Sequence, residues 1–159
     1  MDGCTLLWHQ FDLVFRTYEG FNAQLLTLRG WSVTVGLAGM IAAYSRTGRD
    51  RSATLLLATA AVLGFWAFDT LWKSYQDAYL PWLDQVGALF PEDGRHTACT
   101  SPGDPIAGWR NAHDALEVSD WLGLAARTSL PHGVIALCGA IALLAERRRA
   151  RRLRQEMQT

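Results

Sequence analysis

The sequence predicts an all-α integral membrane protein with three transmembrane helices, an N-terminal amphipathic helix and an irregular external loop. Three observations support this fold class. Hydrophobic residues make up 50% of the 159 residues, they gather in three long blocks, and most arginines flank those blocks on one side. A helix needs roughly 17 to 25 predominantly apolar residues to cross the hydrocarbon core of a bilayer, and each block is long enough.

Residues 1–20 are expected to form an amphipathic interfacial helix. Apolar residues recur at helical spacing from Leu7 to Tyr18, with polar and charged residues between them. Trp8 and Tyr18 suit the headgroup level of a membrane, although the helix could instead pack on the bundle or fold into its mouth. Because no basic segment precedes an apolar run here, we expect no cleavable signal peptide.

Residues 21–45 are the first predicted transmembrane helix, and residues 53–77 are the second with a polar extension. The twenty residues Leu25–Tyr44 contain one charge, Arg29, and the twenty residues Ala53–Trp72 contain one charge, Asp69. No polar face can be drawn on the first block, which disfavours the alternative of a soluble helical bundle. The cytoplasmic turn 46–52 is short, so the two helices should be antiparallel neighbours.

The remainder of the chain divides into an external loop, a third span and a tail. Residues 78–119 are predicted to be an external acidic loop, since prolines and glycines concentrate in 90–108. Residues 120–146 are the third predicted transmembrane helix, in which Pro131 should cause a kink. Residues 147–159 form a basic cytoplasmic tail.

The net charge of zero is the sum of two opposite regions. The loop 46–51 and the tail from Glu146 hold nine arginines and three acidic residues, a net charge of +6. The segment 76–120 holds eight acidic residues and two arginines, a net charge of −6. Basic flanking segments tend to stay in the cytoplasm, so we expect a multi-pass protein of the cell inner membrane with its N-terminus outside and its C-terminus cytoplasmic.

Cysteine positions offer a test of this topology. Cys4 and Cys99 both fall in the predicted external compartment, where disulfides persist, and Cys138 lies within the third span. A disulfide between Cys4 and Cys99 would tie the N-terminal helix to the external loop. The alternative is two unpaired thiols.

Three charges of the predicted spans should lie at one depth. Counting about 1.5 Å per residue from the cytoplasmic ends places Arg29 at roughly 22 Å, Asp69 at roughly 24 Å and Arg127 at roughly 27 Å. We expect Arg29 to pair with Asp69, and Lys73 competes because it lies four residues beyond Asp69 on the same helical face. This set is either a functional polar layer lining or closing a pore, or a group of interface charges that only fixes helix depth.

Other features bear on partners. Small residues spaced by four would permit close helix contacts in a homo-oligomer; they are Ala38 and Ala42, Ala60 and Gly64, and Ala136 and Ala140. The basic tail could bind anionic lipid headgroups, a cytoplasmic partner, or nucleic acid or nucleotide, or it could serve topology alone. Its arginines are Arg147, Arg148, Arg149, Arg151, Arg152 and Arg154.

Signatures of catalysis and of bound cofactors are weak. The chain has no phosphate-binding Gly loop, nucleophile elbow or H-E-x-x-H sequence, so we expect neither catalytic residues nor a metal or cofactor. His132 could ligate haem only with a second histidine at matching depth. His96 and Cys99, with His113, form at most a weak metal-binding pattern.

Two segments carry a resemblance to a known class of protein. The first is Asn22–Leu26 followed by Arg29–Thr34, and the second is Phe65–Asp69 with Lys73 and Gln76. Over about 55 residues the chain resembles small prokaryotic multi-pass proteins that include membrane effectors of antiphage defence. Among these is the ion-channel effector of the Hailong type, which works beside a nucleotidyltransferase.

These observations favour an oligomeric membrane channel or pore-forming effector, with a defence role implied by the resemblance. The alternative is a non-catalytic membrane scaffold or accessory subunit of a larger membrane complex, assembled through the small-residue faces and the basic tail. A third class is a haem or quinone protein that uses His132. The expected partners are the lipid bilayer and further copies of the chain.

Overall fold

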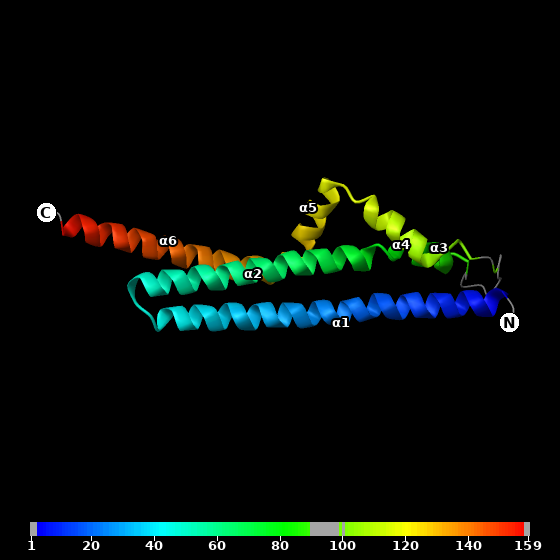
Figure 1. Ribbon diagram of the computed structural model, residues 1–159, viewed down its shortest axis with the longest axis horizontal. Helices are drawn as coiled ribbons and strands as arrows, with labels where there is room; N and C mark the ends of the chain where they lie inside the picture. Colours follow the sequence, from blue (N-terminus) through cyan, green and yellow to red (C-terminus); the bar gives the residue numbers. More distant parts are fainter. Residues whose placement is uncertain (1–2, 90–98, 100, 158–159) are drawn as a thin grey trace. The chain divides into compact units, whose positions relative to one another are not determined.

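The computed structural model describes residues 3–89, 99 and 101–157, and within these ranges the chain is all-helical (Figure 1). Its helices are α1 (Gly3–Tyr44), α2 (Gly48–Asp77), α3 (Leu80–Gly87), α4 (Pro105–Asp114), α5 (Val118–Arg127) and α6 (His132–Glu156). Two stretches, Gly3–Tyr44 and Asp50–Gly87, are long and apolar enough to cross a membrane. A third span is present if α5 and α6, which are bent by 82° at their break, are counted as one.

The first predicted boundary is wrong, because α1 runs through residue 20 without a break. The amphipathic segment and the first apolar block are therefore one helix of 42 residues. Gly20 is the only strong helix breaker near the expected boundary, and a single glycine costs about 1 kcal/mol relative to alanine. That cost is too small to end a helix whose flanking residues favour it.

The segment 78–119 is not irregular throughout its described part. Pro81 lies in the first turn of α3 and Pro105 lies in the first turn of α4, where a missing N–H group costs nothing. Asp104 caps α4 by accepting a hydrogen bond of 3.0 Å from the backbone N–H of Ile106. The prolines that predicted a loop thus begin helices, whereas residues 90–98 and 100 lie outside the described residues.

The third predicted span also differs from the expectation of one kinked helix. Helix α5 ends at Arg127 and α6 begins at His132, so residues 128–131 interrupt the helix completely. Pro131 sits immediately before α6, where it removes a backbone donor and restricts the preceding residue. At the other end, α6 continues to Glu156, so most of the basic tail is helical.

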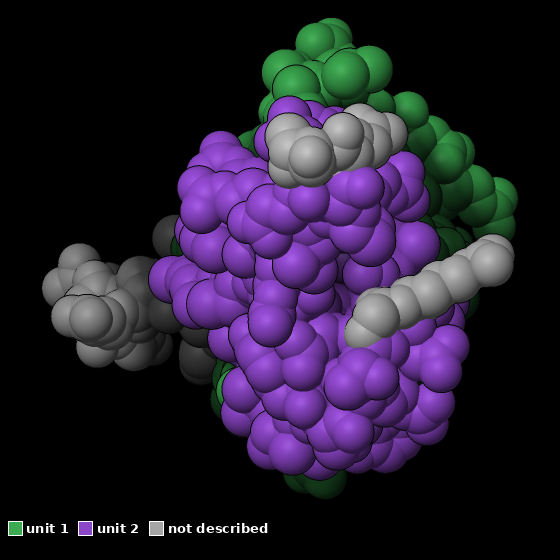
Figure 2. All heavy atoms as spheres, turned by 90° about the vertical axis from the view of Figure 1, so that its left-hand side faces the viewer, with its two compact units in different colours: residues 1–26, 70–124 green, residues 27–69, 125–159 purple. Residues whose placement is uncertain are grey.

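The chain divides into two compact units, which Figure 2 distinguishes by colour. Unit 1 comprises residues 1–26 and 70–124, and unit 2 comprises residues 27–69 and 125–159. The core of unit 1 joins Leu7 and Val14 of α1 to three residues of α3, namely Trp82, Leu83 and Val86. A disulfide between Cys4 and Cys99, with Cα atoms 4.7 Å apart, links the start of α1 to the segment before α4.

Unit 2 is a close packing of three helices. A Cβ atom added at Gly36 of α1 would lie 2.7 Å from Ile135 of α6 and 2.8 Å from Val62 of α2. One added at Gly39 would lie 2.6 Å from the Cβ of Ala58. Only glycine permits these approaches, so the backbone of α1 lies directly against side chains of α2 and α6.

The outward surface of unit 2 is strongly apolar. Large hydrophobic side chains that are more than half exposed lie on all three helices, among them Trp31, Ile41, Leu57, Phe68 and Leu137. A water-facing helix normally presents polar residues on its outer face. The pattern of unit 2 therefore suits helices that are surrounded by lipid.

Candidate functional site

Unit 2 contains a buried group of polar side chains, here called the Asp69 cluster, made of Arg29, Ser32, Asp69 and His132. Asp69 lies on α2 with its side chain fully buried. Its Oδ2 atom accepts a hydrogen bond of 2.9 Å from Nε of Arg29 on α1, and it lies 3.1 Å from Nε2 of His132 on α6. One carboxylate oxygen therefore connects three helices.

His132 extends the cluster back to α1. Its Nδ1 atom lies 2.7 Å from Oγ of Ser32, and both side chains are fully buried. An ionised carboxylate can only accept, so Nε2 of the histidine donates to Asp69. In the neutral ring Nδ1 then accepts from the Ser32 hydroxyl, whereas in the charged ring Nδ1 donates to it.

Sequence position explains why these residues meet. Arg29 and Asp69 lie on the helices α1 and α2, which are joined by the turn 45–47. Ser32 follows Arg29 by three residues, so both side chains point from the same face of α1. His132 is the first residue of α6 and enters the cluster from the helix end.

Two features leave the cluster electrostatically incomplete. The second carboxylate oxygen of Asp69, Oδ1, is buried and has no hydrogen-bond partner among the described residues. The Arg29 side chain is 32% exposed, so its guanidinium reaches the edge of the unit. Buried charges are normally fully hydrogen-bonded, and an orphaned carboxylate oxygen marks a position where another donor or cation would be favoured.

The cluster contains the residue types of a Ser-His-Asp catalytic triad, but its geometry does not allow catalysis. Ser32 connects to His132 and His132 connects to Asp69, as in serine hydrolases. Ser32, however, is fully buried inside α1, where the surrounding backbone N–H groups bond to helix carbonyls. A substrate carbonyl would have neither access to the hydroxyl nor donors for its oxyanion.

The structure brings together part of the predicted polar layer. Arg29 and Asp69 form the expected pair. Lys73 does not compete for Asp69, because its Nζ atom lies 2.9 Å from Asp77 and 2.8 Å from Gln76 in unit 1. Arg127 is exposed at the end of α5 and is not a member of the cluster.

Sequence reasoning assigned His132 no place in this layer. The signal was available, because His132 lies thirteen residues from Ala145, which corresponds to roughly 20 Å of helix and is close to the depth of Asp69. Counting the depth of charged residues alone does not reach His132, and its place beside Pro131 suggests a haem ligand as readily as a partner for a carboxylate.

The remaining predicted sites are placed as follows. The tail arginines lie on the last turns of α6, after its apolar part. Cys138 is a free, exposed thiol on α6. Among the described residues no three His, Cys, Asp or Glu side chains are grouped so that they could hold a metal ion, and His96 lies outside those residues.

Comparison of the chain with protein-family models, with curated proteins and with solved structures finds no match. The site is therefore interpreted from its own geometry. That geometry is a salt bridge with an attached histidine, buried where three apolar helices meet. Such a group can hold the three helices of unit 2 together.

Proposed function

We propose that the protein is an oligomeric membrane channel or pore-forming effector whose closed state is held by the Asp69 cluster. The observation that carries the proposal is the complete burial of Asp69 between Arg29 and His132. A charged residue at the centre of a membrane span costs about 2.5 to 3.5 kcal/mol on insertion scales. Ionisable residues in spans are for this reason normally tied to ion pathways, proton relays or gating.

The pore belongs between copies of the chain and not within one copy. Gly36 and Gly39 bring α1, α2 and α6 into contact, which leaves no room for a water-filled path among them. The opposite face of α2 is open, since nothing lies within 4 Å of a Cβ atom added at Gly64. Ala60 and Gly64 on this face allow a second copy to approach closely.

The same proposal sets the orientation. The arginines of the turn and of α6 remain in the cytoplasm, and unit 1 with its disulfide lies on the external side of the inner membrane. The acidic residues of the external segment would then raise the cation concentration near the mouth of the pore. In this arrangement the Asp69 cluster lies closer to the external surface than to the cytoplasm.

A role in antiphage defence rests on the resemblance of the first two helices to membrane effectors. In such a role the channel stays closed until infection and then depolarises the membrane. Loss of the Asp69 contact is the step that we assign to opening. The channel would then be toxic when opened without infection.

Purified protein in mild detergent tests the proposal by its oligomeric state and by conductance in planar bilayers. We expect a closed oligomer with low conductance, and a raised open fraction in Asp69→Asn because a neutral amide has no charge to pair with the guanidinium of Arg29. Asp77→Asn is the matched control, since its carboxylate pairs locally with Lys73, and it should behave as wild type. A monomer that conducts in neither the wild-type nor the Asp69→Asn form contradicts the proposal.

A further inference from the structure

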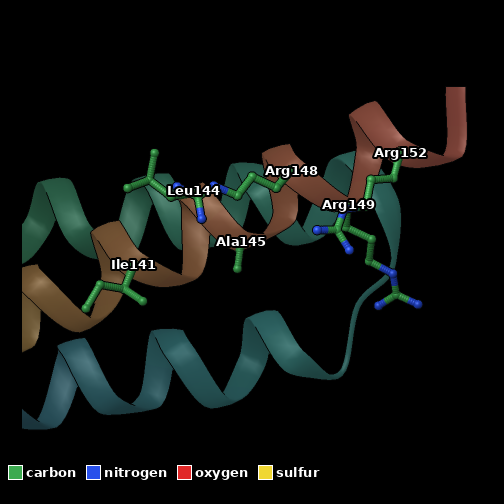
Figure 3. Close-up of a pocket in the computed structure, with 6 residues that line it drawn as sticks. All are labelled: Ile141, Leu144, Ala145, Arg148, Arg149 and Arg152. Atoms are coloured by element: carbon green, nitrogen blue, oxygen red, sulfur yellow. The ribbon is translucent and has the colours of Figure 1, made fainter. Parts of the chain in front are cut away.

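One face of α6 changes from apolar to basic along its length. A groove of about 530 Å³ is lined by Ile141, Leu144, Ala145, Arg148, Arg149 and Arg152. Figure 3 shows the six side chains along this part of α6. Their spacing of three and four residues places all six on one side of the helix.

The two halves of this groove suit the two halves of a lipid. Ile141 is 57% exposed and Leu144 is 54% exposed, so the apolar half presents an open hydrocarbon surface. The basic half begins with Arg148, one turn beyond Leu144, and its three arginines are exposed. An acyl chain on the apolar half would therefore place its phosphate within reach of the arginines.

Charge distinguishes this groove from its neighbour. No acidic side chain is among the six residues that line it. The neighbouring groove shares Arg149 and also contains Arg51 and Arg154, but its Glu146 forms an ion pair of 2.8 Å with Arg51 and so neutralises part of that surface. An anionic headgroup should therefore prefer the groove of Arg148, Arg149 and Arg152.

We infer that this face of α6 is a binding site for one anionic phospholipid. The headgroup phosphate binds to Arg148, Arg149 and Arg152, and an acyl chain packs along Ile141 and Leu144. A free phosphate or a nucleic acid would use the arginines but would leave the apolar half uncovered. The inference requires that α6 lies in a membrane, and it is independent of whether the protein conducts ions.

If the arginines served only to orient the protein in the membrane, their number would matter and the side of α6 on which they lie would not. The chain provides a matched comparison for this alternative. Arg148, Arg149 and Arg152 line the groove, whereas Arg147, Arg151 and Arg154 do not. Replacing either trio by glutamine removes three charges and keeps a good helix former at each position.

Native mass spectrometry of the full chain in mild detergent, titrated with phosphatidylglycerol or phosphatidylcholine, measures binding directly. We expect wild type to bind phosphatidylglycerol on the order of tenfold more tightly than phosphatidylcholine. The variant R148Q/R149Q/R152Q should lose this preference, and R147Q/R151Q/R154Q should retain it within about twofold. Protease accessibility of the tail in sealed membrane vesicles, measured for the same variants, reports whether orientation is unchanged.

Three results would overturn the inference. Equal loss in the two triple variants would mean that total charge and not the groove attracts the lipid. Equal affinity for the two lipids would remove the role of the arginines. Competition by inorganic phosphate at the same concentration as the lipid would show that the apolar half contributes nothing.

Discussion

Different interactions stabilise the interior of each of the two units. Unit 1 relies on a disulfide, on a small apolar core and on aromatic side chains that bond to backbone carbonyls, such as Trp109 Nε1 to the carbonyl oxygen of Tyr75 at 2.9 Å. Unit 2 relies on glycine-mediated helix contacts and on a buried charge cluster. Disulfides are typical of small domains in oxidising extracytoplasmic compartments, and contacts between small residues are typical of helices in lipid.

The difference between the two units indicates which of them is better suited to a conformational change. A disulfide and an aromatic core stabilise a structure without leaving it poised to change. A buried cluster of Asp, Arg and His is costly to assemble, and it loses its stabilising effect as soon as one partner is removed. Under the proposed function, unit 1 is expected to be the more static part, and the Asp69 cluster of unit 2 is the position from which opening would begin.

The largest expected effect comes from removing the carboxylate of Asp69. Asp69→Ala leaves Arg29 and His132 without their acceptor, and breaking a buried pair in this way costs about 3 to 5 kcal/mol. Unfolding of the protein in detergent micelles, followed by tryptophan fluorescence, measures the change.

Asp77→Ala in unit 1 is the control for this prediction. Its partner Lys73 is a neighbour on the same helix, and both side chains are about one quarter exposed. Such a pair contributes about 0.5 kcal/mol. If the two variants lose equal stability, the Asp69 cluster is no more important to the fold than a surface ion pair.

The second effect concerns the disulfide. Cys4→Ser should lower the stability of unit 1 by about 2 to 5 kcal/mol, since the disulfide closes a loop with a sequence separation of 95 residues. Limited proteolysis with and without a reducing agent should show faster cleavage in the segment 78–119, while the apolar part of unit 2 stays protected.

Cys138→Ser is the matched control, because this thiol is free and exposed. It should leave the cleavage pattern unchanged under both conditions. Cleavage of unit 2 as fast as unit 1 after reduction would mean that the disulfide stabilises the whole chain and that the contrast between the units does not hold.

The sequence allowed the helices of lipid-compatible length and one buried pair to be predicted. Hydropathy identified the blocks of α1 and α2 because hydrocarbon leaves a spanning segment few alternatives to helix. Depth counting from the cytoplasmic ends of the two apolar blocks identified Arg29 with Asp69. Both arguments depend on local geometry that a sequence determines well.

The parts that were missed depend on choices that sequence leaves open. Pro81 and Pro105 are compatible with turns and with first helical turns alike, so only their tertiary setting shows that they begin helices. Pro131 is compatible with a kink or with a complete break. The partnership of His132 with Asp69 follows from that break, because it brings a helix end to the cluster.

A smaller effect distinguishes close helix packing from open helix surface. Gly39→Ala adds a methyl group that would lie 2.6 Å from the Cβ of Ala58, so α1 and α2 must separate. We expect a loss of about 1 to 3 kcal/mol from overpacking. Gly64→Ala meets nothing within 4 Å and should be neutral or stabilise the helix by about 1 kcal/mol in the monomer.

In the same unfolding assay, Gly39→Ala should therefore lower the stability and Gly64→Ala should not. A stabilised Gly39→Ala would show that α1 and α2 are not in close contact there. Gly64→Ala has a second use, since a loss of oligomer without a loss of monomer stability would place the contact between copies on the open face of α2.

The smallest effect is the ion pair that links α2 to α6 near the tail. Arg51 and Glu146 are separated by 2.8 Å, and their side chains are 18% and 20% exposed. A double-mutant cycle with Arg51→Gln and Glu146→Gln should give a coupling of about 0.5 to 1 kcal/mol, which is larger than that of the local pair Lys73 and Asp77. A coupling of zero would mean that α6 is held in unit 2 by the Asp69 cluster and apolar packing alone, so that only apolar packing would retain the helix after loss of the Asp69 contact. A measurable coupling would instead retain the cytoplasmic end of α6 and confine the movement to the end that carries His132.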